Sequence, residues 1–287
     1  MAAIGPVWGT DIAKHRDIVF RTYTPLLEAN PDIGFSATRN IPYGAHPRHV
    51  LDVYRPDNCA GAAVLMFVHG GAFVRGAKDS NAQIYSNVPR YFAGQGLLAI
   101  NVEYRLAPEA QYPEGASDVG AAIAWVRTHA HEFGGDPQRL FVMGHSAGGT
   151  HAATYIADPL VRPAQGHGVA GLVLLSARLR LDARPENPNR HGVRAYYGED
   201  ESKYEARAPI TYASNIDIPT FIVIAEFDNP FLDVYGAEML HRLAVARGRA
   251  PRFLRLTRHN HTSMVAHFNT GEDILGREIL DFIDRGC

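Results

Sequence analysis

Short apolar runs alternate with longer amphipathic segments over most of the 287-residue chain. One amphipathic segment, residues 115–131, places Val119, Ile123 and Val126 on one face of a helix. Short, largely apolar runs of four to seven residues are typical of strands buried on both faces of a parallel sheet. We therefore predict an α/β fold with a central, mostly parallel sheet and helices on both faces. The runs are Ala63–Val68, Leu97–Val102, Leu140–Met143, Val169–Leu175, Thr220–Ala225 and Phe253–Leu256.

Two segments interrupt this alternation. In residues 1–40, the spacing of Ile18, Thr22, Leu26 and Leu27 predicts a helix outside the sheet. Residues 176–215 form a long connection rich in Arg, Pro, Asn and Tyr, and a loop of that length commonly has a function of its own. We interpret residues 1–287 as one domain in which these two segments form a small cap over the functional site.

Charge and cysteine content narrow the range of partners. The 28 Lys and Arg residues against 30 Asp and Glu residues give a net charge of −2, so we expect no nucleic-acid partner. Cys59 and Cys287 lie too far apart in the sequence to suggest a disulfide framework, and no secretory signal pattern is visible near Met1. Two stretches without Asp, Glu, Lys or Arg, residues 58–74 and 140–157, are interrupted by His and Gly and make poor membrane spans. We therefore expect a cytoplasmic protein without a transmembrane segment.

The sequence GHSAG, residues 144–148, follows the apolar run Leu140–Met143 and precedes a segment of small residues. A serine on a tight turn between a strand and a helix has its hydroxyl projecting, and the flanking glycines relieve the crowding of the backbone. The N-terminus of the following helix also favours a developing negative charge. The strand-turn-helix context favours Ser146 as a nucleophile over an ordinary Gly/Ser-rich turn.

The sequence HGGA, residues 69–72, directly follows the apolar run Ala63–Val68. Residues with little or no side chain let backbone N–H groups approach a substrate oxygen, as an oxyanion hole requires. The spacing of Gly71 and Gly76 also resembles a phosphate-binding loop, but Ala77 occupies the position of the required lysine. Neither a dinucleotide-binding glycine motif nor a CxxC pair is present. We expect no cofactor.

Taken together, three motifs in this order resemble the hormone-sensitive-lipase-like carboxylesterases of the α/β-hydrolase superfamily. The resemblance extends from about Asp52 to the C-terminus. Ala72 replaces the usual third glycine, and the usual His-Gly-Phe is missing near the expected histidine, which makes the chain similar to the kynurenine formamidase and feruloyl-esterase-like branch. The motifs are HGGA, then YRLAPE at residues 104–109 with Tyr112, Pro113 and Asp118, and finally GHSAGG at residues 144–149.

The resemblance implies a catalytic acid and a catalytic histidine after the serine. Asp228 follows the run Thr220–Ala225, so it stands at the carboxyl end of a strand, where a carboxylate can orient an imidazole. Asp233 is the alternative acid, and an ordinary turn or helix-cap role is the alternative for Asp228. For the base we favour His261, because the Asn-His-Thr-Ser-Met-Val segment resembles that branch of the family.

Two further histidines, His259 and His267, compete with His261 for the role of base, and we expect them to be structural or exposed. His259 and His261 also form an H-x-H pair, but one pair without further ligands is a weak metal signal, so we expect no metal site. The other site residues implied by the resemblance are backbone donors and pocket side chains. We assign the oxyanion hole to Gly70, Gly71, Ala72 and Ala147, and substrate binding to Phe73, His145, Tyr196 and Tyr197.

These residues predict a serine hydrolase that cleaves carboxylic esters of short or medium acyl chains through an acyl-enzyme, with aliphatic polyester fragments among the candidate substrates. One alternative is an amide hydrolase of the arylformamidase type. The other is a non-catalytic binding protein built on a hydrolase fold. The presence of Ser146, Asp228 and His261 favours an enzyme with a small-molecule ester substrate. The sequence leaves the oligomeric state open, a homodimer included.

Overall fold

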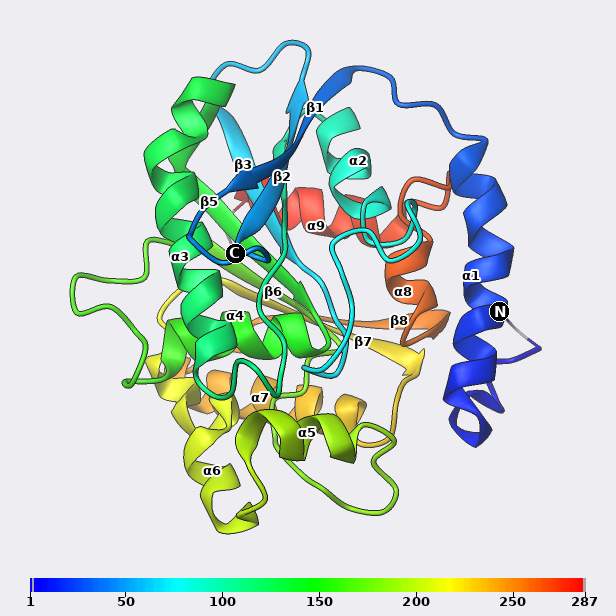
Figure 1. Ribbon diagram of the computed structural model, residues 1–287, viewed down its shortest axis with the longest axis vertical. Helices are drawn as coiled ribbons and strands as arrows, with labels where there is room; N and C mark the ends of the chain where they lie inside the picture. Colours follow the sequence, from blue (N-terminus) through cyan, green and yellow to red (C-terminus); the bar gives the residue numbers. More distant parts are fainter. Residues whose placement is uncertain (2, 286–287) are drawn as a thin grey trace.

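The computed structural model describes Met1 and residues 3–285 and is organised around one sheet (Figure 1). Within these residues the sheet has eight strands in the order β1-β2-β4-β3-β5-β6-β7-β8. The six strands β4, β3, β5, β6, β7 and β8 pair in parallel. Strand β2 pairs antiparallel with both of its neighbours, β1 and β4. The mostly parallel sheet is therefore confirmed. The bounds are β1 Phe35–Pro42, β2 Val50–Pro56, β3 Ala62–Val68, β4 Leu98–Val102, β5 Gly135–His145, β6 Gly171–Leu175, β7 Thr220–Phe227 and β8 Arg252–Asn260.

Each of the six apolar runs lies in a strand of the sheet, from β3 to β8, except that Leu97 precedes the start of β4 by one residue and Val169 that of β6 by two. The strands β1 and β2 were not predicted. Strand β1 is the edge of the sheet and is largely exposed, so it lacks an apolar run. Strand β2 is buried but contains Asp52 and Arg55, which interrupt its apolar pattern.

Helices cover both faces of the sheet (Figure 1). Successive residues of β3 point to opposite faces: Val64, Met66 and Val68 belong to the core cluster that includes residues of α3, α4 and α7, whereas Leu65 and Phe67 belong to the cluster that includes residues of α2, α8 and α9. The amphipathic segment predicted around Val119 is helix α3. The helices are α1 Ile12–Glu28, α2 Asn87–Gly94, α3 Glu114–His129, α4 Ala147–Ala157, α5 Arg190–Tyr197, α6 Tyr204–Arg207, α7 Leu232–Arg247, α8 Ser263–Ala266 and α9 Ile274–Arg285; short 3₁₀ turns are Trp8–Thr10, Ala130–Phe133, Glu201–Lys203 and Pro209–Asn215.

Helix α1 stands outside the sheet beside α8, as the sequence predicted for this segment (Figure 1). Asp11 caps its N-terminus by accepting a hydrogen bond from the backbone N–H of Lys14 at 3.0 Å. Residues four apart, Val19, Tyr23 and Leu27, form its buried face. A separate apolar cluster thus attaches α1 to the rest of the protein, and it consists of Trp8, Val19, Tyr23, Leu27, Ile84 and Ala266.

Four of the parallel strands end at the same edge of the sheet, where functional residues collect in such folds. HGGA follows β3, Ser146 follows β5, Asp228 follows β7, and His261 follows β8. No helix in the described residues is long and apolar enough to cross a membrane. Cys59 is a free cysteine, and Cys287 lies outside the described residues.

Candidate active site

Ser146 occupies the turn between β5 and α4 in a strained conformation, with φ 53° and ψ −121°. The two flanking glycines are required there by close backbone contacts. A Cβ atom on Gly144 would lie 2.5 Å from Gly149, and one on Gly148 would lie 2.2 Å from the carbonyl oxygen of Val68. The backbone N–H of Ser146 donates to Leu175 at 2.9 Å and fixes the turn against β6. The Gly-x-Ser-x-Gly spacing thus has a steric cause.

Asp228 and His261 form a buried hydrogen-bonded pair beyond the ends of β7 and β8. The Nδ1 atom of His261 lies 2.8 Å from Oδ1 of Asp228. The same carboxylate accepts the hydroxyl of Ser176 and the backbone N–H groups of Ala225 and Asn229, at 3.3 and 2.8 Å. Because an ionised carboxylate only accepts, His261 carries a proton on Nδ1, and its Nε2 atom is left to act as a base.

The competing acid and base candidates lie apart from this pair. Asp233 is exposed on the first turn of α7, where its carboxylate accepts the N–H of Val234. His259 pairs with Glu272 at 3.1 Å, and Nδ1 of His267 lies 3.0 Å from the carbonyl oxygen of Ser263. Burial, together with the neighbouring charge of His259, lowers the pKa of His267 to about 4. In the described part of the chain, no cluster of three or more His, Cys, Asp or Glu side chains has the arrangement of a metal site.

Ser146 and His261 line one cavity of about 390 Å³. Its walls come from helix α1, from the loop after β3, and from the ends of β5, β7 and β8. This size is within the ordinary range of small-molecule sites. The lining residues are Ile12, Arg16, Phe20, Gly70, Gly71, Ala72, Arg75, Gly76, Ala77, Ser80, Tyr85, His145, Ser146, Asn189, Asn229, His261 and Thr262.

The loop after β3 forms one wall of this cavity through Gly70, Gly71 and Ala72. Gly71 has a φ of 151°, and a Cβ atom on it would lie 1.7 Å from the carbonyl oxygen of Arg75, so only glycine fits. Ala72 has a φ of 52°, an uncommon conformation for a residue with a side chain. Ala147, the fourth expected oxyanion donor, is the buried first residue of α4. The structure thus brings three of the four donors to the cavity wall and places the fourth directly after Ser146.

Glu103 holds both ends of this loop. Its Oε1 atom lies 2.9 Å from Nε2 of His69, and its Oε2 atom accepts the backbone N–H of Lys78 at 3.0 Å. Burial favours the neutral carboxyl, but the hydrogen bond to His69 and the charge of Arg48 outweigh it, and the pKa of Glu103 lies below its ordinary value. The other nitrogen of His69 lies 2.7 Å from the carbonyl oxygen of Gly70. A buried ionised carboxylate therefore fixes the loop that carries the expected oxyanion donors.

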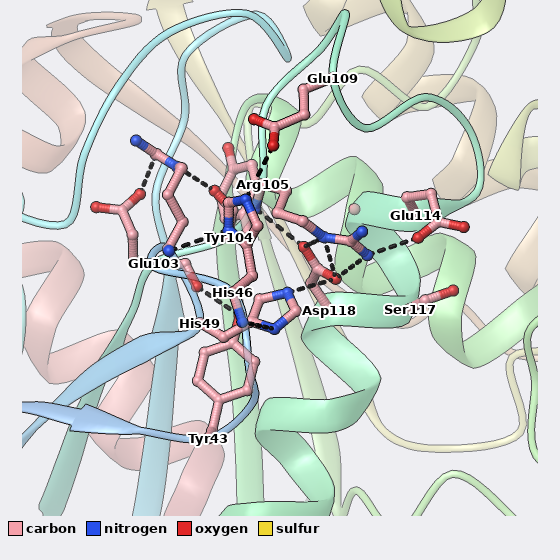
Figure 2. Close-up of polar contacts among 12 residues, drawn as sticks. Tyr43, His46, His49, Glu103, Tyr104, Arg105, Glu109, Glu114, Ser117 and Asp118 are labelled. Carbon is pink, nitrogen blue, oxygen red and sulfur yellow. Dashed lines mark hydrogen bonds and ion pairs between the residues drawn. The ribbon is translucent and has the colours of Figure 1, made fainter.

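The YRLAPE segment, residues 104–109, directly follows Glu103, and the hydroxyl of Tyr104 donates to the carbonyl oxygen of His69 at 2.9 Å. Figure 2 shows the guanidinium group of Arg105 between the carboxylates of Glu114 and Asp118, with the ring of His49 beside Asp118. Burial raises the pKa of Asp118, but its hydrogen bonds to Arg105 outweigh this, so the net shift is downward. No residue of this motif lines the cavity among the described residues, and the ion pairs of Arg105 anchor the segment that follows β4 to helix α3.

His145 directly precedes Ser146 and lines the cavity, where the expected substrate contact would be made. Its Nε2 atom is 2.9 Å from the carbonyl oxygen of His261, and its Nδ1 atom is 3.2 Å from the hydroxyl of Tyr85. Burial, with the nearby His261, lowers its pKa well below the usual value, so the ring is neutral. A neutral ring that donates from Nε2 to a carbonyl must accept from Tyr85 at Nδ1. His145 thus connects Tyr85 with the backbone of the expected base.

The prediction that Phe73, Tyr196 and Tyr197 line the cavity was wrong. They are at most 2% exposed and pack on one another, with Phe73 and Tyr196 stacked at 5.0 Å. Helix α5 brings them together because Gly192 lets its backbone approach Ala72; a Cβ atom there would lie 2.0 Å from the Ala72 carbonyl oxygen. The hydroxyl of Tyr196 accepts the N–H of Gly115 at 3.1 Å, so its polar end is satisfied inside the protein.

Several lining residues were not found from the sequence. Helix α1 contributes Ile12, Arg16 and Phe20, and the loop after β3 contributes Arg75. Isolated arginines and apolar residues in amphipathic segments are common on any protein surface, so they carried no signal of a site. From residues 176–215 the cavity receives Asn189, which lies in the loop before α5.

Comparison with known families gives two overlapping matches. The model of the prolyl oligopeptidase family matches residues 107–286, and that of the BD-FAE family matches residues 51–157. The chain belongs to the prolyl oligopeptidase family. The first match covers Ser146, Asp228 and His261, and the second covers the loop after β3 together with Ser146. Both matches agree with the α/β-hydrolase resemblance of the motifs.

The relatives of this α/β-hydrolase are named esterases. It is 41% identical to esterase LipC of Mycobacterium tuberculosis over 39% of this chain and 27% of the relative. It is 40% identical to carboxylesterase NlhH of the same organism over 50% of this chain and 44% of the relative. The aligned region thus spans less than half of each of these curated relatives.

Solved structures confirm the fold over nearly the whole chain. An esterase of Pyrobaculum calidifontis superposes with a TM-score of 0.73 at 23% identity and covers 96% of this chain and 93% of its own. Esterase B of Lactobacillus rhamnosis superposes with a TM-score of 0.75 at 17% identity, over 99% and 96% of the two chains. At these identities the likeness establishes the α/β-hydrolase fold alone.

Proposed function

We propose that this α/β-hydrolase cleaves carboxylic esters of short or medium acyl chains through an acyl-enzyme. The observation that carries the proposal is the placement of Ser146, on a strained turn, in the same cavity as His261, whose Nδ1 atom is bonded to Asp228. The esterase names of the relatives support the same class of reaction. Residues 1–40 and 176–215 are the cap in this proposal, since α1 and Asn189 contribute to the cavity wall.

The first half of the reaction forms the acyl-enzyme. Nε2 of His261 accepts the proton of the Ser146 hydroxyl while Oγ attacks the carbonyl carbon of the ester, and the carbonyl oxygen becomes an oxyanion. When the tetrahedral intermediate collapses, the bond to the alcohol oxygen breaks, and His261 returns the proton to that oxygen. Asp228 stabilises the imidazolium formed in between and keeps the ring in the required tautomer.

The second half repeats these steps with water as the nucleophile. His261 removes a proton from water, the hydroxide attacks the acyl carbon, and the carboxylic acid leaves as the proton returns to Ser146. In both halves the oxyanion would accept hydrogen bonds from backbone N–H groups of Gly70, Gly71, Ala72 and Ala147. The loop that carries the first three is held at both ends by Glu103, so these donors require little reorganisation during the reaction.

The test is a hydrolysis panel with wild-type protein and the Ser146→Ala variant. The panel contains para-nitrophenyl esters of short and long acids, an aryl formamide and an insoluble aliphatic polyester. We expect the highest kcat/KM for short and medium esters, and a loss in kcat of roughly 10⁴- to 10⁶-fold in the variant. A serine-directed phosphonate should add once per wild-type chain, as measured by mass spectrometry.

Three outcomes would contradict the proposal. A Ser146→Ala protein that keeps a tenth of the wild-type activity would exclude this serine as the nucleophile. Faster turnover of the formamide than of every ester would indicate an arylformamidase-type enzyme. A folded wild-type protein that hydrolyses none of the probes and takes up no phosphonate would indicate a binding protein on a hydrolase fold.

A further inference from the structure

Two guanidinium groups line the cavity that contains Ser146. Arg16 comes from helix α1, and Arg75 comes from the loop after β3, so segments far apart in the sequence supply the two positive charges. The lining contains no Asp or Glu among the residues that the structure describes. Asp228, the carboxylate bonded to His261, is almost wholly buried behind the ring. The cavity therefore has a positive wall that its own side chains do not neutralise.

The hydrogen-bond partners of the two arginines show that both have donors to spare. Arg75 donates to the neutral side chain of Asn189 at 3.0 Å and makes no ion pair within the described residues. Arg16 forms one ion pair in the described part of the chain, with the exposed carboxylate of its sequence neighbour Asp17 at 3.3 Å. By contrast, Arg105, outside the cavity, contacts both Glu114 and Asp118. An exposed pair such as that of Arg16 is weak and leaves the guanidinium available to a ligand.

The two positive charges are close enough to affect each other. Partial burial and the charge of Arg16 both lower the pKa of Arg75, and both arginines act on Tyr85, which also lines the cavity. Like charges that share a site repel each other, and an anion bound between them would relieve this repulsion. The planar guanidinium group presents several N–H donors in a geometry that matches a carboxylate.

We propose that the substrate of this hydrolase is an ester that carries a carboxylate elsewhere in the molecule, and that Arg16 and Arg75 bind this carboxylate. The inference rests on the proposed ester hydrolysis and names the class of ester. Asn189 holds Arg75 in place, and Ile12 and Phe20 offer apolar surface to the carbon chain between the carboxylate and the scissile bond. Arg16 and Arg75 are specificity-determining residues; they take no part in the proton transfers.

The experiment compares charged and neutral esters of matched shape. On the acyl side, the mono-para-nitrophenyl ester of adipic acid is paired with the ester whose terminal carboxylate is replaced by an isopropyl group. On the alcohol side, para-acetoxybenzoate is paired with para-isopropylphenyl acetate. The ratio of kcat/KM, charged over neutral, is measured for the wild type and for the Arg16→Gln/Arg75→Gln double variant. Because each ratio is taken within one protein, any general loss of activity cancels.

We expect the double variant to lower this ratio by roughly tenfold in at least one pair, because a charge-assisted contact to carboxylate is lost. Arg277→Gln is the matched control: Arg277 is exposed on α9, outside the cavity lining, and the ratio should stay at its wild-type value. Ratios that change by less than twofold in both pairs, with the neutral esters still hydrolysed, would overturn this inference alone. A wild-type protein that hydrolyses none of the four esters would contradict the proposed ester hydrolysis itself.

Discussion

Ser176 donates its hydroxyl to Oδ2 of Asp228, the carboxylate oxygen that does not contact His261. The backbone N–H of Ala225 lies 3.3 Å from the same oxygen. Ser176 directly follows β6, has a φ of 41°, and is held by its own N–H to Val223 at 2.8 Å. The orientation of the expected acid therefore depends on a side chain from a third strand, in addition to its own turn.

Removal of this contact should reduce turnover more than binding. In Ser176→Ala, the carboxylate loses one donor and part of its orientation, so we expect kcat to fall by roughly tenfold with little change in KM. Steady-state kinetics with para-nitrophenyl butyrate measure both constants. Ser117→Ala, at an exposed position of α3, is the matched control and should keep wild-type values. An unchanged kcat in Ser176→Ala would show that the turn alone orients Asp228.

The two acid candidates separate in a second comparison. Asp228→Asn keeps the shape of the side chain but lets His261 adopt the wrong tautomer, and we expect kcat to fall by about 10⁴-fold. Asp233→Asn removes only an exposed carboxylate that accepts the N–H of Val234, so activity should stay within about twofold of wild type. The same kinetic assay decides between them, and equal losses in the two variants would contradict the assignment of Asp228.

Acid should destabilise the protein through buried neutral histidines. His151 on α4 is buried, its Nε2 atom has no partner in the described structure, and burial lowers its pKa to about 3. The unfolded chain, with a pKa near 6.5, binds the proton first, so stability from this group is complete above pH 6.5 and is lost as pH falls toward 3. This single group predicts a loss of about 2 kcal/mol between pH 7 and pH 5.

Urea unfolding at these two pH values measures that loss. In His151→Leu the difference between the two free energies of unfolding should shrink by about 2 kcal/mol, because the group no longer titrates. His241→Gln, at an exposed position of α7, is the control and should keep the wild-type difference. An undiminished pH dependence in His151→Leu would assign the acid sensitivity to other groups.

Adjacent tyrosines on α5 should respond in opposite directions when their hydroxyls are removed. The hydroxyl of Tyr197 is buried without a partner in the described residues, so Tyr197→Phe should raise the free energy of unfolding by about 1 kcal/mol. The hydroxyl of Tyr196 accepts the N–H of Gly115, so Tyr196→Phe should lower it by about 1 kcal/mol. Denaturant melts at one pH give both values. Equal signs for the two variants would contradict this account of the aromatic cluster.

Strands were predictable from the sequence where burial on both faces imposed a continuous apolar run, as in β3 and β6. Strand β1 could not be predicted in this way, because an edge strand with exposed faces needs no apolar run. Nor could strand β2, because Asp52 is buried yet charged: its carboxylate is bonded to Lys78 at 2.9 Å. An ion pair between residues on different elements is a tertiary fact, and the composition of a single strand does not reveal it.

The expected reacting residues could be found because each follows a strand that the apolar pattern had identified, and parallel strands end at a common edge. Most of the side chains that line the cavity could not be found from the sequence. Tyr196 looks amphipathic in the sequence, but the acceptor site on its hydroxyl is filled by Gly115, from another helix. Arg16 and Arg75 have no motif around them, and the folded positions of α1 and of the loop after β3 bring them to the cavity that Ser146 lines. Which side chains line the cavity is thus decided by contacts between segments that are far apart in the sequence.

The contact at Gly192 has a consequence for how such an enzyme can diversify. Because the backbone of α5 rests directly on Ala72, a rigid-body shift of α5 would displace the loop that carries the expected oxyanion donors. Helix α1 instead contacts the connection between β3 and α2 farther along, through Ile84 and through the hydrogen bond that the side chain of Asn81 donates to Thr24 at 2.9 Å. Natural variation or laboratory recombination in residues 1–40 can therefore alter the substrate range while the reacting groups keep their positions. We expect homologous chimeras exchanged at this N-terminal segment to retain turnover and acquire a different preference among esters.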